Sequence, residues 1–187
     1  MTKRPEKTFI SADALLIDSI RLAKMVYEDG FFPDIIVGLW RGGAPIAVSV
    51  HEYFCYRQRP CDHIPVRVSS YGNNNTQRKQ IDIDGLDYLI KTIKAEHKLL
   101  LVDDVFDSGR SLEALLTTIR KSSGSQMAGQ VKTACPWYKP NNARAAIKPD
   151  YYLHTTDQWL VFPHELMSLT TDDIKNGKGE PLASLLL

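Results

Sequence analysis

The 187-residue sequence has few cysteines, almost no net charge and no long apolar run. Its three cysteines are too few and too odd in number for a disulfide framework, so we expect a reducing, cytoplasmic compartment. The 23 basic and 22 acidic side chains nearly cancel, which argues against a general nucleic-acid-binding protein. No apolar run is long enough to span a membrane, and the N-terminus lacks the apolar core of a signal peptide. We therefore expect a soluble protein with no nucleic-acid or membrane partner.

The composition is that of an ordinary globular protein, with 43% apolar and 24% charged residues. A chain of this length corresponds to one domain, and we see neither an internal repeat nor a linker. We therefore treat residues 1–187 as a single domain.

Apolar periodicity predicts strands that alternate with helices. We expect helices from Ser11 to Gly30, over 44–56, over 86–95 and from 111 to about 119, and strands over 35–39, 64–71, 99–102, 130–135 and 151–154. Such alternation predicts an α/β fold with a mostly parallel sheet, and ligands of such sheets bind at the carboxyl ends of the strands.

The most informative segment is residues 99–111, where four apolar residues run into Asp103 and Asp104 and then into a Ser/Gly turn. Backbone N–H groups of such a turn, with a helix dipole behind them, suit a phosphate group. Gly109 allows close approach of a ligand, and carboxylates beside a phosphate suit Mg²⁺ or sugar hydroxyls. A solvated strand end with an ordinary helix cap is the alternative, but it leaves this density of aspartate, serine and glycine unexplained.

Residues 99–111 closely resemble the phosphoribosyl-pyrophosphate signature of the type I phosphoribosyltransferases. The resemblance implies a twisted, mostly parallel sheet flanked by helices, with a small hood for the base. It covers a core of about residues 30–166, with the hood partly from 137–168, and leaves the tail 169–187 unassigned. It also implies that Asp103 and Asp104 hold the ribose hydroxyls and help bind Mg²⁺. The 5′-phosphate would lie in the loop formed by Asp107, Ser108, Gly109, Arg110 and Ser111.

Two further segments match the family more loosely. Arg41 and Gly42 follow the first predicted strand, where the family has its pyrophosphate loop, and an arginine there can give bidentate bonds to diphosphate. Ser70 and Tyr71 precede an Asn-rich stretch and resemble the lid that closes over the diphosphate in the purine branch. Read alone, Arg41 and Gly42 after a strand more often form a plain turn, and a flexible surface hairpin explains Ser70 and Tyr71 nearly as well as a lid does.

The base pocket is predicted from two segments near the C-terminus. Lys139 falls where 6-oxopurine transferases have a lysine that donates to purine O6, and Trp159 offers a flat face for stacking. Leu160 belongs to the segment whose main chain reads the edge of the base, and Glu165 matches the family's last acidic residue, which can touch the N2 region or a second Mg²⁺. Taken singly, Lys139 fits a surface lysine equally well and Trp159 a core residue.

The resemblance implies transfer of a phosphoribosyl group from phosphoribosyl pyrophosphate to hypoxanthine, guanine or xanthine, with Asp107 as general base at purine N7. A transferase for another base and a nucleotide-sensing regulator without turnover remain as alternatives. Related enzymes form homodimers or homotetramers, and we expect one of these states. The apolar ending 182–187 is expected to pack against the body or a second subunit.

Overall fold

The structure is a computed structural model that describes residues 7–71, 80–124, 129–167 and 169–186. Its elements, in chain order, are β1 (Lys7–Phe9), α1 (Ala12–Glu28), β2 (Ile35–Trp40), α2 (Gly43–Tyr56), β3 (Asp62–Tyr71), β4 (Gln80–Asp84), α3 (Asp87–Thr92), β5 (Lys98–Val102), β6 (Val105–Phe106), α4 (Arg110–Ser123), β7 (Gln130–Tyr138), β8 (Tyr151–Thr155), β9 (Trp159–Val161), α5 (Thr171–Asp173), the π-helical turn η2 (Ile174–Lys178) and α6 (Glu180–Leu186).

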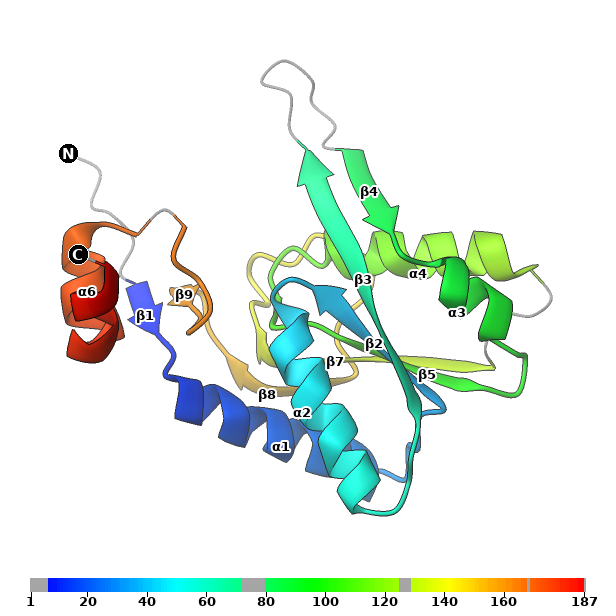
Figure 1. The fold of residues 1–187 in the computed structure, drawn as a ribbon. Helices are drawn as coiled ribbons and strands as arrows, with labels where there is room; N and C mark the ends of the chain where they lie inside the picture. The colour runs from blue at the N-terminus through cyan, green and yellow to red at the C-terminus, as the bar shows by residue number, and fades with distance from the viewer. Residues whose placement is uncertain (1–6, 72–79, 125–128, 168, 187) are drawn as a thin grey trace.

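Within these residues, seven strands form one sheet in the order β4-β3-β2-β5-β7-β6, and β8 also pairs with β7. All neighbours are parallel except β3 and β4, which are antiparallel. The prediction of a mostly parallel α/β sheet is thus confirmed, and Figure 1 shows helices on both of its faces.

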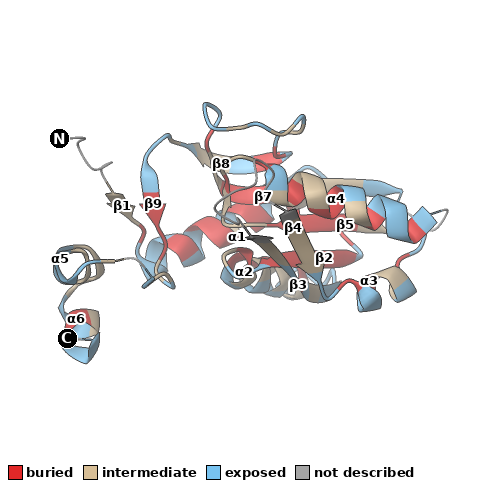
Figure 2. Cartoon of the chain, turned by 90° about the horizontal axis from the view of Figure 1, so that it is seen from above, coloured by how far each residue is buried: buried red, intermediate tan, exposed pale blue. Residues whose placement is uncertain are grey.

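The central strands are buried on both faces because apolar residues occupy every position rather than every second one. One core packs alternate residues of β2 and β5 against α1 and α2. The other core packs the remaining residues of these strands against α3 and α4. In Figure 2 the buried colour accordingly follows the strands and the inner faces of the helices.

A smaller unit, which we call the hood, stands beside the sheet (Figure 1). It contains β1 and β9, which pair in parallel although about 150 residues separate them, together with the tail elements α5, η2 and α6. Phe9 pairs with Val161, and α1 then runs from this strand back to the sheet. The hood therefore joins both ends of the described chain.

The main predicted elements agree with the structure within a few residues. Ser11 caps α1 by accepting a hydrogen bond from the Ala14 amide, and Gly30 follows the helix with a left-handed φ of 74°. The sequence analysis did not predict β1, β4, β6 or β9, which are short or lie at an edge. No described helix combines the length and apolar character that a membrane crossing requires.

The apolar ending is placed differently from the expectation that it packs on the body. Ala183 is buried, but Leu185 is 81% exposed and Leu186 is 43% exposed. The tail instead contacts the rest of the hood through Asp173, Gly177 and Lys178. Packing against the body is therefore not seen for Leu185 and Leu186, because the short α6 turns only one side inward, and packing against a second subunit stays a prediction.

Candidate functional site at the carboxyl ends of the strands

Three functional candidates follow directly from the ends of three neighbouring parallel strands. Arg41 follows β2, Asp103 follows β5, and Lys139 follows β7. The strand order β2-β5-β7 places these ends side by side at one edge of the sheet. The Asp103 amide donates to the Ala134 carbonyl, and the Lys139 amide donates to the Phe106 carbonyl, so the strand pairing continues into the site.

The turn between β6 and α4 forms a small cradle at the start of a helix. Gly109 has a φ of 76°, and a side chain there would overlap the Phe106 ring, so the chain can follow this path only with glycine. The cradle encloses a cavity of about 70 Å³. It is lined by Asp103, Val105, Phe106, Asp107, Ser108, Gly109, Ser111 and Leu112. Its size and its place at a helix N-terminus suit one phosphate group.

The adjacent carboxylates of Asp103 and Asp104 are held by backbone donors. Asp103 accepts from the Asp104 amide at 3.0 Å, and Asp104 accepts from the Val105 amide at 2.7 Å. Burial raises the pKa of Asp104 to about 6, and burial together with the Asp104 charge raises the pKa of Asp103. The His164 imidazole lies 4.0 Å from the Asp104 carboxylate, and a cation or hydroxyl donors at this place would stabilise the ionised form of the acidic pair.

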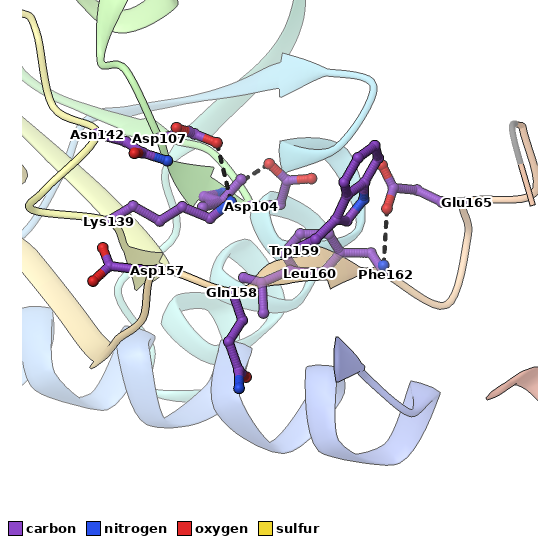
Figure 3. A pocket seen from close by; sticks show the side chains of 11 residues that line it. Asp104, Asp107, Lys139, Asn142, Asp157, Gln158, Trp159, Leu160, Phe162 and Glu165 are labelled. Carbon is purple, nitrogen blue, oxygen red and sulfur yellow. Dashed lines mark hydrogen bonds and ion pairs between the residues drawn. The ribbon is translucent and has the colours of Figure 1, made fainter. Parts of the chain in front are cut away.

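The largest of the three cavities described at this edge has a volume of about 540 Å³ and lies between the sheet and the hood. Lys139 is buried, and its ammonium donates to the Asp107 carboxylate at 3.0 Å. In Figure 3 this pair lies on one side of Asp104 and Trp159 on the other. The indole of Trp159 is 51% exposed, so it is available to a flat ligand rather than packed in the core. The remaining lining residues are Val105, Asn142, Asp157, Gln158, Leu160, Phe162 and Glu165.

A second cavity of about 420 Å³ lies between the loop after β2 and the chain after β9. Arg41 and Gly42 line it on one side and His164 on the other. A side chain at Gly42 would overlap the carboxylate of Asp104, so glycine is needed where these two segments meet. The peptide between Trp40 and Arg41 is cis. Burial lowers the pKa of His164, which favours the neutral imidazole.

Shared residues connect the three cavities into one site. Asp104 and Glu165 line both the first and the second cavity, and Asp107 lines both the first cavity and the cradle. The acidic side chains therefore stand at the centre, with an arginine-lined space, a phosphate-sized cradle and an aromatic space around them. This arrangement matches a ligand that carries two separate anionic groups and meets a flat second ligand.

The structure gathers most, but not all, of the predicted site residues. Arg110 is exposed and is not among the residues that line the cradle. Leu160 is largely buried in the core yet borders the base cavity. The backbones of Ser70 and Tyr71 end β3, whereas their side chains and residues 72–79 lie outside the described part of the structure, so the lid remains a prediction.

Several lining residues were not predicted individually. Asn142 and Asp157 approach the base cavity from two loops, and Asn141 joins these loops by donating to Asp157 at 2.6 Å. His164 and Phe162 stack with ring centroids 5.8 Å apart. His164 and Phe162 could have been identified by their closeness in sequence to Glu165, whereas no local pattern identifies Asn142.

Comparisons with known proteins give a family and a fold for this chain. The model of the phosphoribosyl transferase domain matches residues 9–168. The human phosphoribosyltransferase domain-containing protein 1 is 28% identical over 145 residues, and the match covers 73% of this chain but only 61% of that protein.

Two solved structures at 25% identity or above share the fold. Purine phosphoribosyltransferase from Pyrococcus horikoshii is 26% identical with a TM-score of 0.66, and the match covers 88% of this chain and 97% of the other. The xanthine-guanine-hypoxanthine phosphoribosyltransferase from Helicobacter pylori is 25% identical with a TM-score of 0.66, covering 84% and 92%. This chain therefore belongs to the phosphoribosyl transferase domain family, with the type I fold and a resemblance to its purine branch.

Proposed function

We propose that the protein transfers the 5-phosphoribosyl group from phosphoribosyl pyrophosphate to a 6-oxopurine base. The products are the purine nucleoside 5′-monophosphate and diphosphate, as in purine salvage. The observation that carries the proposal is the connected set of three cavities around Asp104 and Asp107. A sugar that bears a phosphate at one end and a diphosphate at the other fits this arrangement.

In this proposal the cradle formed by 107–111 holds the 5′-phosphate, and Arg41 binds the diphosphate from the second cavity. Arginine suits this role because its planar donors pair bidentately with phosphate oxygens. Asp103 and Asp104 accept hydrogen bonds from the ribose hydroxyls between the two anionic groups. The donation from a hydroxyl to a buried carboxylate would offset part of the burial cost that raises the pKa of Asp104.

The acidic pair also fits the Mg²⁺ that the family uses with phosphoribosyl pyrophosphate. Asp103 and Asp104 offer adjacent oxygen donors, which magnesium prefers. Among the residues that the structure describes, no group of three or more His, Cys, Asp or Glu side chains is arranged to hold a metal. This fits an ion that takes its other ligands from the substrate and water. When bound, the ion would neutralise charge on the diphosphate.

The base would lie in the largest cavity, stacked on Trp159, with Lys139 donating to its 6-oxo group. Lysine carries donors only, so a 6-oxo group is a better partner for it than the 6-amino group of adenine. Stacking on an aromatic ring is worth about 1–3 kcal/mol per base. The preference among hypoxanthine, guanine and xanthine is set by contacts at C2, for which Glu165 is the predicted partner.

In the proposed reaction, purine N9 bonds to the anomeric carbon while the bond from that carbon to the diphosphate oxygen breaks. Asp107 accepts the proton that leaves purine N7. Its carboxylate is half exposed and pairs with Lys139 in the free protein, so an entering base would exchange these contacts for its own. Positive charge that develops on the sugar would be stabilised by the surrounding carboxylates, so most of the rate enhancement would come from positioning and electrostatics.

The proposal is tested by incubating the protein with phosphoribosyl pyrophosphate, Mg²⁺ and hypoxanthine, guanine, xanthine, adenine or a pyrimidine. We expect nucleotide and diphosphate in equal amounts with at least one 6-oxopurine. A higher turnover with adenine or a pyrimidine would contradict the base assignment. Binding of phosphoribosyl pyrophosphate without diphosphate release for any base would instead identify a regulator.

A further inference from the structure

The tail contributes a partly buried cation, Lys178, to the hood. Lys178 ends the π-helical turn η2, and its ammonium donates to the Phe162 carbonyl at 2.5 Å and to the Pro163 carbonyl at 3.4 Å. Burial lowers the pKa of this lysine, while the nearby Glu165 charge opposes the shift. A long flexible side chain is thus partly withdrawn from water to bind two consecutive carbonyls, which costs rotamer entropy and hydration.

The segment that Lys178 contacts forms walls of two cavities. Phe162 and Glu165 line the base cavity, and His164 and Glu165 line the arginine-lined cavity. Within the segment, the Phe162 amide donates to the Glu165 carboxylate at 2.9 Å (Figure 3). Lys178 and Glu165 therefore hold the C=O and the N–H of the same residue. Together they fix the turn from two directions.

The tail is itself anchored at two other points. Lys7 and Asp173 form an ion pair at 2.6 Å, and Gly177 packs against the Phe9 ring so closely that a side chain there would overlap it. Phe9 in turn pairs with Val161, the residue before the contacted segment. The tail that carries Lys178 is thus attached to β1, and β1 pairs with β9. The Lys178 ammonium in turn contacts the carbonyls of Phe162 and Pro163, which directly follow β9.

We propose that Lys178 is a positioning residue that holds the turn 162–165 in the geometry that the base cavity requires. This inference rests on the proposed function for its kinetic consequence. The residues proposed to hold phosphoribosyl pyrophosphate lie mainly on strand ends and on the turn before α4, which Lys178 does not contact. The turn also reaches the arginine-lined cavity through His164 and Glu165, and His164 lies 4.0 Å from Asp104. Loosening the turn should therefore weaken binding of both substrates, with the larger loss for the base, whose cavity Phe162 also lines.

The test uses the full chain with K178M, which keeps side-chain length but removes the ammonium, and K178R, which keeps a cation and its donors. K175M is the matched control, because Lys175 lies in the same helical turn and is exposed. For K178M we expect the KM for the base to rise roughly three- to tenfold, less than the full loss of a charge-assisted hydrogen bond because Lys178 acts on the base only through the turn. The KM for phosphoribosyl pyrophosphate should rise by a smaller factor. K178R should recover most of the base affinity, and K175M should resemble the parent protein.

Amide hydrogen exchange across residues 159–167 supplies a readout that does not require turnover. K178M should exchange faster than K175M in this segment, with unchanged exchange in the central strands. Unchanged exchange, or equal losses for both substrates together with a fall in overall stability, would overturn the inference. If the parent protein transfers to no 6-oxopurine, the proposed function fails, and the exchange comparison alone still decides whether Lys178 holds the turn.

Discussion

Replacing Lys139 by methionine would test the assignment of the base cavity most directly. Lys139 is buried at the end of β7, and its ammonium contacts Asp107 at 3.0 Å in the free protein. Methionine has a similar length and would fill the apolar part of the space without offering a donor. The Asp107 side chain is 48% exposed, so water can hydrate its carboxylate after the change. We therefore expect the free energy of unfolding to change by no more than about 1 kcal/mol.

The expected kinetic loss follows from the hydrogen bond between Lys139 and the purine oxygen. A hydrogen bond to a charged group contributes about 1.5–3 kcal/mol, and each 1.4 kcal/mol corresponds to about a factor of ten. The kcat/KM for hypoxanthine and guanine should therefore fall roughly 10- to 150-fold. Adenine should lose little, because its 6-amino group has no lone pair to offer the ammonium.

The assay is steady-state nucleotide formation with each base at saturating phosphoribosyl pyrophosphate. K148M serves as the control, since Lys148 is an exposed lysine in the loop before β8. Thermal unfolding of both variants separates a kinetic effect from a folding defect. If K139M keeps the parent kcat/KM for hypoxanthine within about twofold, Lys139 does not bind the 6-oxo group and the reasoning is refuted.

Three further changes test other parts of the site. D107N should lower kcat by at least about tenfold with 6-oxopurines, because the proton acceptor is lost, and unchanged turnover at every pH would exclude Asp107 as the base. D104N should abolish most activity yet stabilise the free protein at pH 7.5. Since folding raises the pKa of Asp104 to about 6, the folded state binds its proton more tightly than the unfolded state, and stability falls as pH rises from about 4 to 6. Urea unfolding should therefore show a gain of up to about 3 kcal/mol at pH 7.5 that disappears near pH 4, and an equal gain at both values would contradict this origin. G109A should lower the free energy of unfolding by at least about 2 kcal/mol and raise the KM for phosphoribosyl pyrophosphate. The reason is that alanine disfavours a φ of 76° and its side chain would overlap the Phe106 ring. A variant as stable as the parent protein would show that the turn can adapt.

Local patterns were sufficient for the parts of the site that are contiguous in sequence. Residues 99–111 contain a buried strand, an acidic pair and a turn that begins a helix, and each of these depends on neighbours only a few positions away. The full apolar runs of β2 and β5 similarly predict burial on both faces, whichever strands flank them. The predicted α/β class followed from these elements and their alternation.

Side-chain environments could not be predicted with the same certainty. Lys139 fitted a surface lysine as well as a site residue, and its burial depends on the pairing of β6 with β7. For Arg110 the motif predicts a ligand contact, whereas the structure shows an exposed residue that does not line the cradle. The surroundings of Lys139 depend on residues about 30 positions away in the chain, Phe106 and Asp107. The exposure of Arg110 depends on how the first turn of α4 is oriented.

The sequence by itself determined the strand–turn–helix unit that carries Asp103, Asp104 and Asp107, because short-range sterics and apolar burial specify such a unit almost independently of its surroundings. Only the tertiary structure decided that β1 pairs with β9 across the chain and that Lys178 reaches the wall of the base cavity. These contacts join segments whose individual patterns are weak. Their geometry is set by strand order, by register and by the packing of the hood, which no local pattern encodes.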